Sequence, residues 1–357
     1  MMTQTEILII GQGICGTFLA RELDRLGIAC KVLDEEQPYT ASKAAAGLIN
    51  PVTGRRIVKT WMIDELLPFV KEVYQEMGQE LNRECMTPVK VVDFFPTPQM
   101  RLAFMKRYEE DPSYLQFPSD DHDWDSVFQY ELGYGMISPC YLVDLPGLLA
   151  AARKKMKEKG ILLEDHFDPT ALTIESIGIR YKDIQAAKII FCDGAGSFDN
   201  PWFSLLPFAP NKGEALLIEI ENGSSLPANL VFKKGMSLAP WKEGLHWVGS
   251  SYEWSFTDKG PTETFRTRTE GMLKEWLKLP FRTIEHIASV RPATLERRPF
   301  VGMHPHYPTI GILNGMGTKG CSLAPYFARQ LAEYLKNGAP IQPDADIKRF
   351  SRILARG

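Results

Sequence analysis

The stretch Ile7-Leu-Ile-Ile-Gly-Gln-Gly-Ile-Cys-Gly16 places three glycines directly after a short run of apolar, mostly β-branched residues. Such a run is typical of a buried strand. Residues 17–26 carry leucines at helical spacing, and Gly27 is suited to end that helix. A second apolar run over residues 28–33 ends in Asp34. The order strand, glycine turn, helix, strand and acid within about 30 residues predicts a dinucleotide-binding βαβ unit.

The glycines of this turn have separate roles in such a unit. Gly11 permits a tight turn, Gly13 lets the backbone approach a pyrophosphate, and Gly16 lets the helix pack closely on the strand. The helix begins at Ile14 and Cys15, where free N–H groups and the helix dipole favour phosphate. Glycines at this spacing are also compatible with a plain turn between strand and helix. The surrounding strands and helix favour the nucleotide site.

The acids after the second strand indicate which nucleotide would fit. Asp34 is placed to accept hydrogen bonds from ribose hydroxyls. Glu35 and Glu36 follow directly, and their charge would repel a 2′-phosphate. The sequence therefore disfavours an NADP-type ligand.

The composition of the chain excludes several classes of protein. Its 357 residues, of which 44% are hydrophobic, are enough for two domains with a large core. A net charge of −3 does not favour nucleic acid as a partner. The N-terminus leads straight into the first strand, and no apolar run has the length of a membrane span, so we expect a cytoplasmic protein without a signal peptide. The basic run over residues 153–159 is expected on a solvated helix face.

The cysteines and histidines predict neither a metal site nor disulfides. Six cysteines are scattered without a C-x-x-C pair, which is typical of reduced core residues in a cytosolic protein. The six histidines are also dispersed. His304 and His306 flank Pro305 in a stretch that we expect to form a surface turn, with no metal bound.

Hydrophobic periodicity divides the chain into two kinds of structure. The βαβ pattern at the start and a second glycine turn at residues 314–320 indicate one nucleotide-binding domain, although most of the chain separates them. The central strands look antiparallel. The predicted fold class is α/β, with a Rossmann-like doubly wound domain interrupted by an antiparallel-sheet (α+β) domain. Helices are expected over residues 63–80, 97–110, 144–159, 262–278 and 321–337; strands over 88–95, 161–167, 171–174, 178–182, 187–192, 216–220, 230–233, 236–240, 245–249 and 309–313; and mostly loop over 111–135.

A set of short segments, in this order, resembles the D-amino-acid-oxidase superfamily of FAD-dependent oxidoreductases, and within it the glycine-oxidase-like branch. The resemblance spans nearly the whole chain, and the small-residue segment before Gly47 is the most specific to the branch. The segments are Gly11-Gln-Gly-Ile-Cys-Gly16, Asp34, Ala41-Ser-Lys-Ala-Ala-Ala-Gly47, Cys192-Asp-Gly-Ala-Gly196, Val290-Arg-Pro-Ala-Thr294, Arg298-Pro-Phe-Val-Gly302 and Gly315-Met-Gly-Thr-Lys-Gly320.

The resemblance implies noncovalent FAD, bound in an extended form between the first glycine turn and the last. No histidine lies near residues 42–47, and Cys321 falls inside the last helix, so a covalent flavin is not expected. The implied domains are an FAD-binding domain over residues 1–80, 136–208 and 292–357 and a substrate-binding domain over residues 81–135 and 209–291. The implied cofactor-binding residues are Gly11, Gly13, Ile14, Cys15, Gly16, Asp34, Glu35, Ser42, Lys43, Ala46, Gly47, Leu48, Phe167, Gly194, Ala195, Gly196, Gly315, Met316, Gly317, Thr318, Lys319 and Gly320.

The resemblance also implies which residues act on the substrate. Members of the family oxidise the C–N bond of amino acids or carboxylate-bearing secondary amines by hydride transfer to flavin N5. Arg291 matches the arginine that clamps the substrate carboxylate, because a guanidinium makes two parallel hydrogen bonds. The alternative is an arginine paired with an acid such as Glu296. Lys319 would stabilise negative charge on the reduced flavin at N1/C2=O, and the alternative is a lysine that faces solvent.

The chain departs from the glycine-oxidase pattern around the expected pocket. Ser237 stands where glycine oxidases carry a tyrosine, residues 294–299 are charged, and Thr318-Lys319 replaces an arginine–asparagine pair. These differences favour a substrate larger or more acidic than glycine. The candidates for substrate contact are Asn50, Ser237, Tyr252 and Arg291. Trp254 could wall the pocket with Tyr252, with core packing as the alternative for both, and Arg55 or Arg56 faces either the pocket mouth or solvent.

Three functions are compatible with the sequence. The leading hypothesis is an FAD-dependent amine or amino-acid oxidase or dehydrogenase, with O₂ or another electron acceptor as co-substrate. A second is the oxidoreductase half of the bifunctional enzyme that modifies wobble uridine in tRNA, which belongs to the same superfamily. The acidic net charge and the missing methyltransferase half count against it. A third is a flavin-binding module without turnover, against which Arg291 and Lys319 argue, since neither is needed only to hold FAD.

Overall fold

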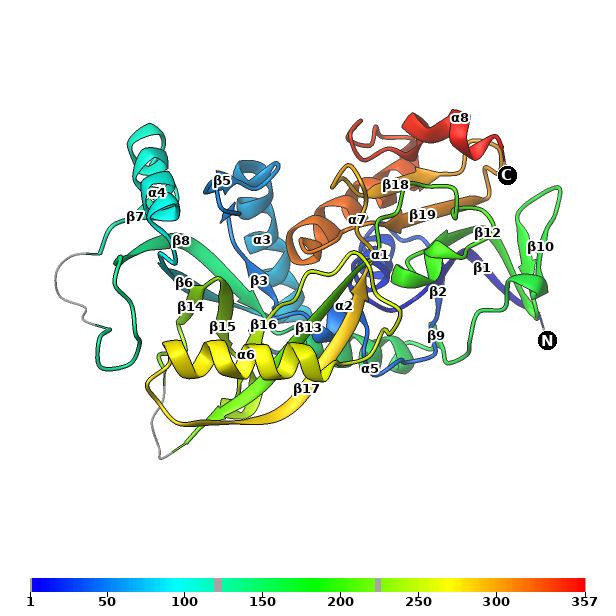
Figure 1. Ribbon diagram of the computed structural model, residues 1–357. Coiled ribbons are helices and arrows are strands. Elements are labelled where there is room, and N and C mark those ends of the chain that lie inside the picture. The colour runs from blue at the N-terminus through cyan, green and yellow to red at the C-terminus, as the bar shows by residue number, and fades with distance from the viewer. Residues whose placement is uncertain (1, 119–123, 222–225, 357) are drawn as a thin grey trace.

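The computed structural model describes residues 2–118, 124–221 and 226–356. Within these residues the chain folds around two large β-sheets. Figure 1 shows the first sheet and both termini at one end of an elongated molecule, and helix α4 (Pro98–Glu110) with part of the second sheet at the other. The predicted α/β class is therefore correct.

The first sheet is built around strand β1, whose neighbours on both sides run parallel to it. Parallel pairing is expected where a helix joins one strand to the next. Because β1, β12 and β19 are parallel, the turns that follow them lie at one edge of the sheet, and these turns contain Gly11, Asp193 and Gly315. The strands in spatial order are β10 (Leu172–Ile174), β11 (Ile179–Tyr181), β12 (Ile184–Phe191), β1 (Thr3–Ile10), β2 (Cys30–Leu33) and β9 (Leu162–Leu163), with β19 (Ile310–Asn314) beside β12 and β18 (Phe300–Met303) beside β19.

Helices cover one face of this sheet and form the larger hydrophobic core with it. Phe18 and Leu23 of one helix and Phe327 and Leu331 of another are fully buried there. The opposite face is closed near the C-terminus by Phe350 and its neighbours. The helices of the larger core are α1 (Ile14–Arg25), α3 (Ile63–Leu81), α5 (Leu145–Glu158) and α7 (Gly320–Asn337); the C-terminal elements are η4 (Ile347–Phe350) and α8 (Ser351–Leu354).

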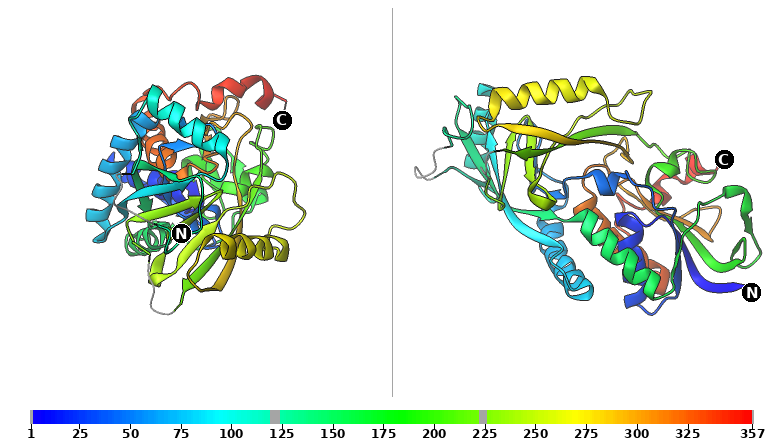
Figure 2. Two further views of the ribbon diagram at one scale, coloured as in Figure 1. Left: turned by 60° about the vertical axis from the view of Figure 1, so that its left-hand side comes forward. Right: turned by 90° about the horizontal axis from the view of Figure 1, so that it is seen from below.

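The second sheet is mostly antiparallel, with one parallel pair between β6 and β14. Helix α6 (Glu263–Trp276) lies along its outer face (Figure 2), where Trp276 packs with Val248. Since side chains alternate along a strand, the inner face carries neighbours of Val248 such as Trp247, which packs on Ala44 and Ala46 of the N-terminal part. The strands in spatial order are β17 (Phe281–Arg291), β13 (Asn211–Ile220), β16 (His246–Gly249), β15 (Met236–Pro240), β14 (Leu230–Lys234), β6 (Met86–Phe94), β8 (Tyr134–Val143) and β3 (Leu48–Ile49), with β7 (Leu115–Gln116) beside β8.

The predicted elements agree with the structure best where a periodic pattern of apolar residues continues over many residues. Helices α3, α4, α5, α6 and α7 occupy their expected positions with small shifts at their ends. The strands β8, β17 and β18 were not predicted, and the strand expected over residues 161–167 shrinks to β9. Part of the expected loop over 111–135 forms β7 and the start of β8, and residues 119–123 lie outside the described part.

The predicted domain bounds stay a prediction. Strand β3 and most of β8 fall in the ranges predicted for FAD binding, yet both pair within the second sheet. The second sheet thus includes short pieces of the ranges predicted for FAD binding.

The expected turn at residues 304–309 forms between β18 and β19, and His306 in it is exposed, but His304 departs from the expected surface position. The His304 side chain is buried, its Nδ1 accepts the backbone N–H groups of His306 and Tyr307, and burial lowers its pKa to about 4. All six cysteines are buried and free, as predicted. Among the described residues, no cluster of histidines, cysteines and acids is arranged to hold a metal, and no helix has the length and apolarity to cross a membrane.

Candidate active site

In the glycine turn after β1, the fold itself requires glycine at two positions and leaves space beside the remaining one. A Cβ on Gly11 would lie 2.6 Å from the Cys192 oxygen, and a Cβ on Gly16 would lie 1.9 Å from the Gly11 oxygen. A Cβ on Gly13 would meet only Ser42 Oγ, at 3.3 Å, among the described residues. The fold therefore accounts for the first and third glycines, whereas it leaves space free beside the middle one.

Asp34 and Ser42 hold the start of α1 from two sides. The Gln12 N–H donates to Asp34 Oδ1 at 2.8 Å, and the Ile14 N–H donates to Ser42 Oγ at 3.1 Å. Asp34 Oδ2 also accepts from Arg153 Nη1 at 2.7 Å. A carboxylate has about four lone-pair sites. The Glu36 N–H donates to Asp34 Oδ2 at 2.9 Å as well, so one acceptor position remains for the predicted ribose hydroxyl.

Arg153 corrects one expectation from the sequence. The basic run that begins at Arg153 was expected on a solvated helix face, but this side chain is 5% exposed. It forms ion pairs with Asp34, Glu36 and Glu164. In the sequence, the only indication that Arg153 is buried was its position in line with the apolar stripe of α5. Its three carboxylate partners could not be assigned, because they come from other elements. Glu35, a predicted cofactor residue, pairs with His166 instead.

The small-residue segment runs between the two sheets. It begins in the single turn α2 (Ala41–Ala44), and Trp247 Nε1 of the second sheet donates to the Ala44 oxygen at 3.0 Å. Ala46 packs on the same sheet, and Lys43 Nζ donates to the Gln37 oxygen at 2.7 Å. Gly47 adopts a φ of +80°, and a Cβ there would lie 2.0 Å from the Val143 oxygen. Close packing on β8, where Leu48 pairs with Leu142, thus requires this glycine.

The turn after β12 is tied to the turn after β19 by buried polar groups. Asn314 Nδ2 donates to the Gly194 oxygen at 2.9 Å and to Ser197 Oγ at 2.8 Å. Asp193 accepts from the Ser197 hydroxyl, and burial raises its pKa to about 6. The predicted residues Gly194, Ala195 and Gly196 begin the short helix η2 (Gly194–Phe198). The residues just before this helix lie beside the first glycine turn, since a Cβ on Gly11 would meet Cys192 and Asp193. Phe167 stacks on Tyr181, with ring centroids 5.1 Å apart, and contacts Phe191 at the end of β12 edge to face.

Lys319 lies at the N-cap of α7 without an acid to balance it. No ion pair joins its ammonium to a carboxylate among the described residues, and Thr318 before it is exposed. Burial, and then the nearby Lys233 ammonium, lower the Lys319 pKa to about 8. A cation at a helix N-terminus is further disfavoured by the helix dipole. In the turn before it, Met316 is buried, and Gly315 and Gly317 adopt positive φ values. An anion bound at this position would offset the unfavourable free energy of placing the Lys319 ammonium there.

Arg291 ends β17, and the hydrogen-bond partners of its guanidinium among the described residues are all neutral. Its Nη1 donates to Asn211 Oδ1 at 2.5 Å and to the Ser251 oxygen at 3.2 Å, and its Nη2 donates to Ser250 Oγ at 2.8 Å. Burial lowers its pKa, and no acid in the described part of the chain offsets that effect. The alternative pairing with Glu296 is wrong, because Glu296 pairs with Arg349 at 3.2 Å. These contacts are therefore compatible with an anion-binding role for the Arg291 guanidinium.

The other substrate candidates lie at different depths. Asn50 is buried and its Oδ1 accepts the Val52 N–H at 3.0 Å, which orders the turn before β4 (Val52–Thr53). Ser237 lies on β15 in register with Gly249 of β16. The structure brings Ser237 to the sheet that carries Arg291, while Asn50 has a local role.

The aromatic pair beside Arg291 faces outward. Tyr252 and Trp254 are 48% and 52% exposed and contact each other edge to face, so core packing is wrong for both. The Arg291 guanidinium lies 5.6 Å from the centroid of the Tyr252 ring. Arg55 and Arg56 are exposed between β4 and β5 (Val58–Lys59), and no ion pair of theirs falls within the described residues.

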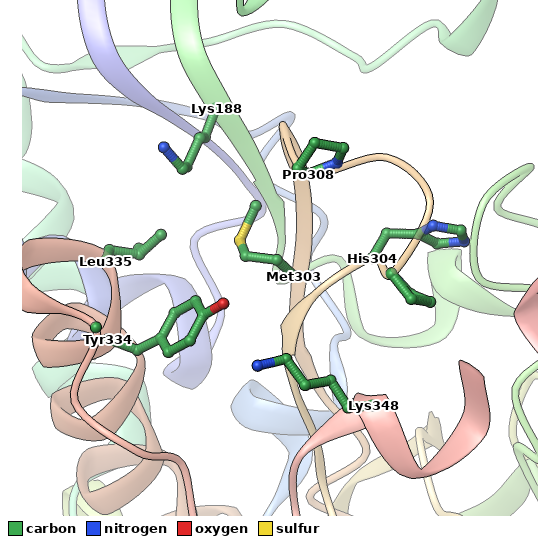
Figure 3. A pocket seen from close by; sticks show the side chains of 9 residues that line it. Lys188, Met303, His304, Pro308, Tyr334, Leu335 and Lys348 are labelled. Carbon is green, nitrogen blue, oxygen red and sulfur yellow. The ribbon is translucent and has the colours of Figure 1, made fainter.

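A cavity of about 470 Å³ lies away from these residues, at the opposite end of β19 (Figure 3). Lys188, Met303, Tyr334 and Lys348 are among its lining side chains. None of the predicted site residues lines it. A second cavity, of about 270 Å³, lies between Arg153 and Trp241 and includes Lys43 of the predicted cofactor residues.

The depressed pKa of Lys319 predicts a pH dependence of stability. The pKa is about 8 in the fold and 10.5 in the unfolded chain, so between these values the unfolded chain binds more protons. The free energy of unfolding of the flavin-free protein should therefore rise from pH 7.5 to 9.5, by an amount on the order of 1–2 kcal/mol. Urea denaturation at both pH values should show this rise, and Lys319→Met should lack it. Lys336→Met, exposed at the far end of α7, should retain the rise, and an equal slope in all three proteins would contradict the argument.

Comparison with known proteins gives the family. Residues 6–334 match the model of the DAO family, FAD dependent oxidoreductase. The chain is 30% identical to glycine oxidase of Pseudomonas putida over 362 residues, which cover 94% of this chain and 96% of that protein. Glycine oxidase from Geobacillus kaustophilus has a similar structure, with a TM-score of 0.79 at 15% identity over 96% of this chain and 98% of that one. Iminodiacetate oxidase from Chelativorans sp. BNC1 gives 0.75 at 20% identity over 97% and 98%. The chain therefore belongs to the DAO family of FAD-dependent oxidoreductases, in its glycine-oxidase-like branch.

Proposed function

We propose that the chain binds FAD noncovalently and oxidises the C–N bond of an amino acid or a carboxylate-bearing secondary amine. The observation that carries the proposal is the Arg291 guanidinium, which is partly buried yet has no carboxylate partner among the described residues. A structural arginine in such a place would be paired. A ligand carboxylate would supply the missing charge.

The residues present fit FAD. The open space at Gly13 and the start of α1 would hold the pyrophosphate, and Asp34 would hold the ribose. Cys321 is buried and burial raises its pKa to about 12, so its thiol is not disposed to form a flavin linkage. The segment from Ser42 to Ala46 would pass beside the isoalloxazine, since it lies between the two sheets. When bound, FAD supplies a ring that accepts a hydride equivalent from the carbon next to the substrate nitrogen.

Arg291 would bind and orient the substrate. Asn211 and Ser250 contact the two terminal nitrogens of its guanidinium and so fix the plane in which it can bind a carboxylate. Two parallel hydrogen bonds would restrain both the position and the rotation of the substrate. The chain needs no proton acceptor of its own if the amine binds neutral, because the nitrogen lone pair then drives the bond cleavage. The imine product would hydrolyse to an oxo acid or an aldehyde.

Lys319 would favour negative charge beside it. Its ammonium lies at the N-cap of α7, and no acid in the described part of the chain pairs with it. Such fixed charges act where negative charge develops, because they need no reorganisation. Lys319 would thus favour the reduced, anionic state of the cofactor.

The relatives suggest the substrate class without fixing it. Similar proteins are named glycine oxidase and iminodiacetate oxidase. Ser237 in place of a tyrosine, and the charged residues at 294–299 and 319, favour a substrate larger or more acidic than glycine.

Anaerobic titration of the purified yellow protein with candidate amines tests the proposal. Loss of the flavin absorbance near 450 nm with at least one carboxylate-bearing amine is the expected result. Admission of O₂ or of an artificial dye would then identify the electron acceptor. A yellow protein that no amine bleaches would instead be a flavin-binding module, and a protein that cannot be loaded with FAD would contradict the proposal altogether.

A further inference from the structure

The inner face of the second sheet carries an ion pair beside a group of buried apolar side chains. Val91, Val231 and Ala239 are buried on this face and pack with Ala46 of the predicted flavin-side segment. Asp93 and Lys233 follow Val91 and Val231 by two residues on the same two strands. Because side chains alternate between the faces of a sheet, Asp93 and Lys233 lie on this face too. Asp93 Oδ2 and Lys233 Nζ are 2.7 Å apart. The pair thus faces the same side as the predicted flavin segment.

Stability alone does not explain this pair. The Asp93 side chain is 1% exposed, and burial raises its pKa. A buried ion pair is often no better for stability than apolar side chains of the same volume. Moreover, Asp93 Oδ1 is buried without a hydrogen-bond partner among the described residues. The chain keeps an incompletely satisfied pair at a position where its neighbours are valines.

The two partners differ in how they can be reached. The Lys233 side chain is 21% exposed, whereas that of Asp93 is almost fully enclosed. Asp93 therefore holds the Lys233 ammonium in place from its buried side. The remaining N–H groups of that ammonium can donate hydrogen bonds to a ligand. Lys319 lies close enough for the two ammonium groups to repel each other. With two lysines and one aspartate, this end of the site has an excess of one positive charge.

The pair lies a short distance across the sheet from Arg291. Arg291 donates to Ser250, which directly follows Gly249. Gly249 is in register with Ser237, and Ser237 is in register with Lys233. Two strand spacings, about 10 Å, therefore separate Gly249 from Lys233. The residue between them in the sheet is the small Ser237, and the Trp247 ring covers Gly249, since a Cβ there would lie 2.8 Å from it.

From this arrangement we infer that Lys233 binds a second anionic group of the substrate, held in place by Asp93, so that the preferred substrates are amines with two carboxylates a few carbon atoms apart. The inference rests on the proposed function, in which Arg291 binds the first carboxylate. Lys233 is then a residue that determines specificity, and Asp93 positions it.

Steady-state kinetics with paired substrates test the inference. The wild type should use iminodiacetate or glutamate better than sarcosine or alanine. Lys233→Met should lower kcat/KM for the dicarboxylic amines about 30-fold or more, mainly through KM, and change it less than about 3-fold for the monocarboxylic ones. Lys234→Met is the matched control, because Lys234 is the next residue on the opposite face and donates to the Gln129 oxygen. It should leave both classes unchanged.

A second variant and a binding measurement protect the test against misfolding. Lys233→Met leaves a buried carboxylate unpaired, so the double variant Asp93→Asn, Lys233→Met should be made as well; it should retain flavin and show the same selective loss. Glutarate and butyrate, which cannot be oxidised, should perturb the flavin spectrum of the wild type with clearly different affinities, and this difference should vanish in the double variant. An equal loss for both substrate classes would overturn the second subsite while leaving the proposed function intact. A wild type that no amine reduces would overturn the proposed function itself.

Discussion

Replacement of Arg291 by alanine is expected to raise the KM for a carboxylate-bearing amine on the order of 10²-fold or more, which corresponds to roughly 2–4 kcal/mol of lost binding. The guanidinium is contacted by Asn211, Ser250 and Ser251, which are all neutral. Its removal therefore leaves no protein charge unpaired among the described residues, and the cost should fall on the substrate. Flavin absorbance of the purified variant should show that FAD stays bound.

Arg282→Ala provides the matched control for this prediction. Arg282 lies on the same strand, β17, but is exposed and pairs with Glu219. Its loss should leave KM unchanged, because exposed ion pairs contribute little. Normal turnover by Arg291→Ala would show that the carboxylate binds elsewhere.

Gly13→Val is expected to abolish FAD binding while the protein stays folded. A Cβ on Gly13 meets only Ser42 Oγ, at 3.3 Å, within the described residues, and φ at this position is −69°. The flavin-free fold therefore tolerates a side chain here, whereas a pyrophosphate would collide with it. The purified variant should be colourless, with a circular dichroism spectrum like that of the flavin-free wild type.

Gly16→Ala should behave in the opposite way. Its Cβ would lie 1.9 Å from the Gly11 oxygen, which belongs to the backbone and cannot turn aside. The helix would have to move away from β1, at a cost of about 1–3 kcal/mol or more. Thermal unfolding should detect this loss even without flavin. A Gly13→Val protein that still binds FAD, or a Gly16→Ala protein as stable as the wild type, would contradict the division of roles in this turn.

The sequence predicted the helices well and the second sheet less well. Helices α3 and α7 repeat apolar residues over many turns, and this periodicity depends only on neighbours along the chain. Strand β17 was missed although it ends at Arg291. Its exposed residues alternate imperfectly with buried ones, and a bulge against β13 breaks the register. Such a strand is defined by its partner rather than by its own pattern.

The candidate site shows the same difference between local and long-range information. The family motifs indicated Arg291 and Lys319, but not the side chains that surround them. Asn211 lies 80 residues from Arg291 along the chain, and Asp93 lies 140 residues from Lys233. Glu296, which is close to Arg291 in sequence, pairs with Arg349 instead. Arg153 was expected in solvent and is buried beside Asp34.

By itself the sequence determined the glycine turn, the acid after the second strand, the main helices and the family of the chain. These features depend on backbone conformation, capping and periodicity, which act over a few residues. Only the tertiary structure decided which charges are balanced: Asp34 by Arg153, Asp93 by Lys233, and neither Arg291 nor Lys319 by any acid among the described residues. The physical reason is that the cost of burying a charge depends on what the fold brings next to it, and those partners come from distant parts of the chain.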